Sequence, residues 1–92
     1  MGSAFQELTN ARLSLPDDLG AATLFVELLY KLDTSHFTDA QFERLEEFIE
    51  DAIRLLNRSP EPKAQDLIRQ LAVGLDGVRE GLPPNPTMRP TK

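Results

Sequence analysis

The residues best suited to chemistry are a group of carboxylates on one predicted helix. They recur at helical spacing and are Glu43, Glu46, Glu47, Glu50 and Asp51. Carboxylate-bridged metal sites in helical bundles need inward-pointing glutamates with a histidine three residues further on. These carboxylates instead lie opposite the apolar face of their helix, and the sequence contains no Glu-x-x-His. We therefore predict a solvated acidic face, with an acidic docking surface for a basic protein partner as the functional alternative.

The single histidine, His36, lies in a predicted loop beside Asp33 and Ser35. Residues so close in one loop do not adopt the nucleophile, base and orienter geometry of a catalytic triad. A chain with one histidine and no cysteine also lacks the usual ligand set of a zinc site. The glycines at positions 74 and 77 do not form a nucleotide-binding motif, because they follow no predicted strand and no P-loop lysine comes after them. The sequence thus predicts no catalytic residue, no cofactor, no metal and no enzyme activity.

The composition favours a small folded protein. The chain has 92 residues, of which 40% are hydrophobic and 27% charged, and a chain of this length buries only a thin core. A net charge of −5 with scattered basic residues argues against direct nucleic-acid binding. The apolar run over residues 19–32 is too short for a bilayer span of about 20 residues. Because no signal peptide and no cysteine are evident, the expected location is the cytoplasm.

Start and stop signals predict an all-α fold. Three long helices are expected, over residues 17–33, 38–58 and 62–80. The clearest start is Thr38 with Gln41 three residues later, which form a capping box. Gly81 is a suitable C-terminal cap for the last of these helices. The loops between the helices are short, so the sequence predicts a small antiparallel three-helix bundle.

Both ends of the chain differ in composition from the predicted bundle. Phe5, Leu8 and Ala11 recur at three-residue spacing, which predicts a short helix or arm over residues 4–11 that lies across the bundle. Residues 83–92 contain four prolines and no hydrophobic periodicity, so we predict a flexible Pro-rich tail there. One helical domain is therefore expected over residues 4–82.

The predicted helix over residues 17–33 has more apolar surface than one neighbouring face can cover. Its polar residues Thr23, Glu27 and Lys31 form one narrow strip. The other two long helices would cover about half to two-thirds of its circumference. The N-terminal segment could cover the remainder, and a second copy or another protein is the alternative.

We predict the second outcome, a non-enzymatic protein-protein interaction or assembly module that forms a homodimer through the helix over residues 17–33. The expected interface residues are Leu24, Phe25, Leu28, Leu29, Tyr30 and Val73. The alternative function is an inhibitor or antitoxin-like regulator. It would use the acidic face of the helix over residues 38–58 to block a basic, nucleic-acid-binding site on another protein.

Overall fold

The computed structural model describes residues 4–15 and 17–88, and every regular element in this part of the chain is helical. The elements are α1 (Ala4–Arg12), α2 (Leu19–Tyr30), α3 (Asp39–Leu56), α4 (Pro62–Arg79) and the short 3₁₀ helix η1 (Pro86–Met88). The predicted all-α class is therefore confirmed. Each of the four α-helices lies where the sequence predicts one, with ends that differ by no more than three residues.

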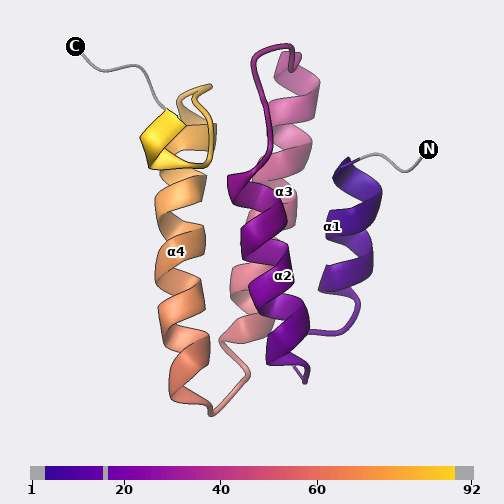
Figure 1. The fold of residues 1–92 in the computed structure, drawn as a ribbon, viewed down its shortest axis with the longest axis vertical. Helices are drawn as coiled ribbons and strands as arrows, with labels where there is room; N and C mark the ends of the chain where they lie inside the picture. The colour runs from indigo at the N-terminus through magenta and orange to yellow at the C-terminus, as the bar shows by residue number, and fades with distance from the viewer. Residues whose placement is uncertain (1–3, 16, 89–92) are drawn as a thin grey trace.

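Consecutive helices run in opposite directions along the molecule. In Figure 1 the chain descends through α1, ascends through α2, descends through α3 and ascends through α4. The short helix α1 packs on both α2 and α3, and α4 also packs on both. Of the predicted short N-terminal helix or arm, the helix is thus present as α1, and it packs beside the three long helices.

Local capping explains where the long helices begin and end. The Thr38 amide donates to Gln41 Oε1 at 2.8 Å, and the Gln41 amide donates to Thr38 Oγ1 at 3.2 Å, which completes the expected capping box. After α4, Gly81 adopts a positive φ of 74°. The Leu82 amide then donates to the Gly77 carbonyl at 2.8 Å, and the Gly81 amide to the Val78 carbonyl. This pair of hydrogen bonds is a Schellman motif, which a glycine adopts without strain.

The core draws side chains from all four helices. Its largest fully buried side chains outside the C-terminal segment are Leu8, Phe25, Leu29, Leu45, Ile49, Leu56 and Leu71. At the α1 end of the core, the Phe5 ring packs edge-on against Phe48 with centroids 5.6 Å apart. The Arg44 guanidinium covers the outer face of Phe5, 4.9 Å from its centroid. The N-terminal segment therefore contributes to the same core as the long helices.

The C-terminal segment is packed, in contrast to the predicted flexible tail. Pro84 is fully buried, and a β-carbon placed at Gly74 would lie only 3.5 Å from its Cβ. Asn85 Nδ2 donates to the Tyr30 carbonyl at the end of α2, at 3.1 Å. The proline ring packs against α4 beside Gly74, so residues 83–88 are packed on the bundle and the prediction of a flexible tail is not confirmed for them. The remaining predicted tail, residues 89–92, lies outside the described residues.

Two leucines of the N-terminal segment test whether α1 is part of the core. Leu8 is fully buried, whereas Leu13, just after α1, is 74% exposed. We expect Leu8→Ala to lower the free energy of unfolding by about 2–5 kcal/mol, because it leaves a cavity. Leu13→Ala should change it by about 0.5 kcal/mol or less. Urea denaturation followed by circular dichroism measures both, and equal effects would contradict the packing of α1.

Candidate functional site

The predicted interface residues of α2 do not share one face. Leu24 is 48% exposed, and Leu28 and Tyr30 are half-buried, so these three side chains are accessible to a partner. Phe25 and Leu29 are fully buried in the core. Their assignment to an interface was wrong, because they lie on the side of α2 that faces α1 and α4 rather than solvent.

The remaining predicted interface residues belong to a different part of the surface. The Tyr30 hydroxyl donates to the Gln70 carbonyl of α4 at 2.9 Å, so the tyrosine links the two helices at their outer edge. Val73 lies one turn further along α4 and is 41% exposed. The structure therefore divides the predicted set into an exposed leucine face on α2 and a separate edge between α2 and α4.

A shallow groove runs between α1 and α2 beside the exposed leucines. It has a volume of about 360 Å³. The α2 wall consists of Ala21, Leu24 and Leu28, and the α1 side contributes Glu7, Asn10, Ala11 and Ser14. The groove thus has an apolar wall on α2 and mostly polar residues on the α1 side. The apolar wall suits the apolar side chains of another helix, while the polar side chains opposite suit contact with water.

The acidic face of α3 is partly neutralised by basic residues from other helices. Arg79 Nε lies 3.0 Å from Glu46 Oε1, and Arg79 Nη2 lies 2.9 Å from Glu50 Oε2. The hydrogen bonds that Arg79 donates to Glu46 and Glu50 raise the pKa of its guanidinium above the ordinary value. Two of the predicted acidic residues therefore serve to join α3 to α4.

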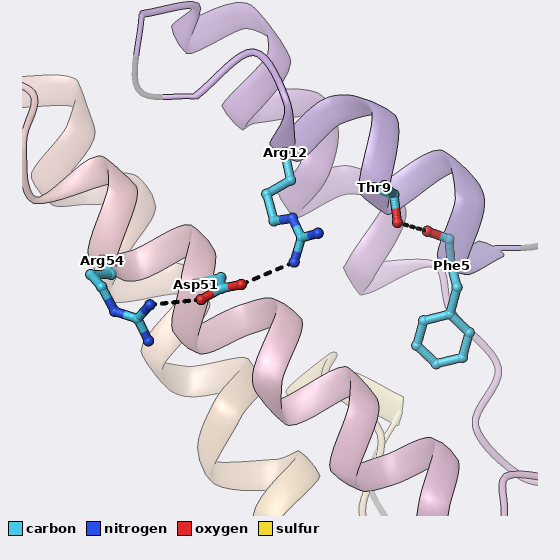
Figure 2. A network of polar contacts seen from close by, with 5 residues as sticks. All are labelled: Phe5, Thr9, Arg12, Asp51 and Arg54. Atoms are coloured by element: carbon cyan, nitrogen blue, oxygen red, sulfur yellow. Dashed lines mark hydrogen bonds and ion pairs between the residues drawn. The ribbon is translucent and has the colours of Figure 1, made fainter.

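Asp51, at the other end of the acidic face, pairs with two arginines. Figure 2 shows its carboxylate between Arg12 of α1, at 3.1 Å, and Arg54 of α3, at 2.8 Å. Arg12 also lies over the Phe48 ring, 4.4 Å from its centroid. In the same view the Thr9 hydroxyl donates to the Phe5 carbonyl within α1. Asp51 thus helps to attach α1 to the bundle.

Glu43 and Glu47 remain as the exposed carboxylates of the predicted acidic face. Neither takes part in an ion pair found among the described residues. The surface available to a basic partner on α3 is therefore smaller than the sequence suggested. Its charge is also reduced by the arginines that sit beside it.

A second hollow lies between the loop after α2 and the C-terminal segment. It has a volume of about 540 Å³ and is lined mainly by apolar side chains, including Leu32, Phe37, Phe42 and Met88. His36 is exposed on this loop. Within residues 4–15 and 17–88, no cluster of three or more potential metal-ligating side chains occurs. The helices of this described part include none long and apolar enough to cross a membrane.

The contacts that join distant segments could not be predicted from the sequence. The pairs Arg12–Asp51 and Arg79–Glu46, and the hydrogen bond from Asn85 to Tyr30, each connect residues at least 33 positions apart. A helical wheel contains no information on such pairs. One signal was present in the sequence, since Gly74 borders the apolar face of α4 and indicated the close approach of another helix. Leu29 of α2 is the closest neighbour there, at 3.3 Å from a β-carbon placed on Gly74, and the contact with Pro84 was not predicted.

Comparison with known proteins finds no family model, no curated protein and no solved structure that matches the chain.

The loop carboxylate Asp33 offers a pH test of the local geometry. Its Oδ1 accepts a hydrogen bond from the Ser35 amide at 3.0 Å, and the backbone and side-chain hydrogen bonds of Ser35 lower its pKa. Because the pKa of Asp33 is lower in the folded chain, its ionised carboxylate stabilises the fold at pH values above the pKa of the unfolded chain. This stabilisation is lost as the pH falls through the pKa of the folded chain. NMR titration should give Asp33 a lower midpoint in the native chain than in urea. Equal midpoints would contradict the observed loop.

Proposed function

We propose that this protein is a non-enzymatic interaction module that self-associates as a homodimer through the exposed face of α2. Leu24 is the exposed leucine of this face, with Leu28 and the groove against α1 beside it. The proposal places the module in the cytoplasm and treats the three long helices as an antiparallel frame, with α1 packed alongside them. Its role is to join polypeptides rather than to convert a substrate.

The exposed position of Leu24 carries the proposal. The helix α2 is covered by α1 and by α4, and four of its apolar side chains, Ala22, Phe25, Val26 and Leu29, are buried. Leu24 remains 48% exposed, on the side of α2 that also carries the exposed residues Gly20 and Glu27. Burying it together with Leu28 would remove apolar area from water at about 25 cal/mol per Å². A core of this size would gain measurably from such burial.

The geometry favours a modest affinity. The helix α2 has twelve residues and is about 18 Å long. A pair of such helices buries less than the roughly 1,200 Å² that is typical of tight complexes. We therefore expect a dissociation constant of about 1–100 µM, which corresponds to about 5–8 kcal/mol of binding free energy.

The acidic face of α3 receives less support as a docking surface. Glu46, Glu50 and Asp51 already pair with arginines of this chain. A basic partner would need to compete with Arg79 and Arg12 for these carboxylates. The exposed leucine face has no such internal competitor.

Sedimentation equilibrium over about 0.5–500 µM, which brackets the expected dissociation constant, tests the proposal. We expect the native chain to change from monomer to dimer in this range. Leu24→Glu should weaken association at least about tenfold, because it places a charge at the centre of an apolar contact. Circular dichroism should show an unchanged helical content.

Two controls separate the leucine face from simple charge effects. Ala72→Glu adds the same charge at an exposed position of α4 and should leave association unchanged. A Glu43→Gln, Glu47→Gln double variant tests the acidic face and should also associate normally. A native chain that remains monomeric at the highest concentration would overturn the proposal, and so would equal association of Leu24→Glu.

A further inference from the structure

The second hollow, between the loop after α2 and the C-terminal segment, has the size and lining of a small-ligand site. Its volume of about 540 Å³ lies within the range of roughly 300–1,000 Å³ that is usual for ligand pockets. In Figure 1 the loop, the start of α3 and the C-terminal segment all lie at the upper end of the molecule. These three parts of the chain supply the apolar lining, which consists of Leu32, Phe37, Phe42, Leu82, Pro83 and Met88.

Contacts within the chain hold the walls of the hollow in place. The Phe37 ring packs on Phe42 with centroids 5.5 Å apart, and on Phe5 of α1 at 5.8 Å. The Phe37 amide also donates to the Thr34 carbonyl at 3.0 Å, which closes a turn of the loop. The C-terminal wall is anchored by Pro84, which is fully buried. The hollow is therefore formed by the fold itself, as ligand pockets usually are.

The lining carries a negative charge. Asp33 is the single charged residue among the described residues that line the hollow, and His36 of the same loop does not line it. The Asp33 carboxylate accepts the Ser35 amide hydrogen and takes part in no ion pair found within residues 4–15 and 17–88. The hydrogen bonds of Ser35 lower the pKa of Asp33, so the carboxylate is ionised at neutral pH. A cation in the hollow would meet this charge.

A polar cleft adjoins the hollow, since Phe42 and Gly81 line both. Its acidic lining residues are Asp39, Glu43 and Glu46. Arg79, the one basic residue found in its lining, already pairs with Glu46 and Glu50. Carboxylates therefore lie on both sides of Phe42, and their field attracts cations and repels anions.

We infer that the second hollow binds a small organic cation with an apolar body. The apolar body would lie against Phe37, Leu82 and Met88, and the cationic group would lie beside the Asp33 carboxylate. This site is distinct from the proposed dimer contact, because the hollow and the groove beside Leu24 share no lining residue.

The two parts of the lining contribute differently to binding. Apolar contact supplies affinity whatever the charge of the ligand, and Met88, with its flexible thioether, can adapt to the shape of the apolar body. Asp33 is exposed, and ion pairs at exposed sites are weak. The carboxylate therefore selects between ligands of the same shape rather than supplying most of the affinity.

Three probes with one apolar body separate the effect of charge from that of apolar area. At neutral pH phenylbutylamine is a cation, phenylbutanol is neutral and phenylbutyrate is an anion. Each is titrated into the full chain and followed by NMR. We expect a dissociation constant of about 0.1–5 mM for the amine. The alcohol should bind about two- to fivefold more weakly, and the carboxylate more weakly still. The shifted amides should belong to residues 32–37 and 81–88.

The variant Asp33→Asn tests the carboxylate, because asparagine keeps an oxygen that can accept the Ser35 amide hydrogen. It should weaken binding of the amine about two- to fivefold and leave binding of the alcohol unchanged. Asp17→Asn is the matched control, since Asp17 is exposed just before α2 and does not line the hollow. This control should bind all three probes as the native chain does.

The variant Met88→Ala tests the apolar wall. Met88 is 51% exposed, so the fold should tolerate its truncation. Binding of the amine and of the alcohol should weaken equally, by at least about twofold, because both lose the same apolar contact. Leu13→Ala, which truncates an exposed leucine outside the hollow, is the control and should change neither.

Four results would overturn the inference. They are no binding of the amine up to about 20 mM, equal binding of the three probes, amide shifts confined to the groove between α1 and α2, and hollow amides that shift with protein concentration alone. The last would show that a second copy fills the hollow. A blocked tripeptide with phenylalanine between two lysines is the final arm. If it binds more than about tenfold tighter than the amine, the occupant is a protein segment and the inference is wrong.

The test is independent of the proposed dimer. Leu24 does not line the hollow, so Leu24→Glu should bind the amine with the native dissociation constant. A monomeric native chain that binds the amine would overturn the proposed function alone. A dimeric chain that does not bind it would overturn this inference alone.

Discussion

The need to cover α2 determines how the rest of this chain is arranged. Ten of its twelve residues are glycine or apolar, so an uncovered α2 would expose a large hydrophobic surface. The helix α1 covers one side, α4 covers another, and the C-terminal segment lies across the end of α2 with Pro84 buried and Asn85 bound to the Tyr30 carbonyl. The helix α1 and the C-terminal segment therefore bury apolar surface of α2 that α3 and α4 leave uncovered.

Ion pairs then hold the covering elements in place. Arg12 attaches α1 to α3 through Asp51, and Arg79 attaches α4 to α3 through Glu46 and Glu50. These side chains are partly exposed, and each such pair contributes little to the free energy of unfolding. Their effect is on orientation, since each one restricts how two helices rotate against each other. This explains why the acidic face of α3 coincides with the edges where its neighbours pack.

The elements could be predicted from the sequence, whereas their contacts could not. The capping box at Thr38 and the glycine at position 81 are local signals, so they located helix ends correctly. Whether Phe25 or Leu24 faces the core depends on the positions of α1 and α4, and no local sequence pattern encodes these positions. Likewise, four prolines suggested a flexible tail, but the ring of Pro84 is also an apolar group that fits beside Gly74.

An exposed leucine alone is weak support for an interface, because apolar atoms make up more than half of an ordinary protein surface. The case for α2 depends on what surrounds Leu24. Leu28 and Ala21 lie beside it and form, with Leu24, the α2 wall of the groove, so a helix that contacts Leu24 would also bury part of this wall. The burial of α2 within the chain and the proposed contact at Leu24 between chains both reflect the high apolar content of this helix.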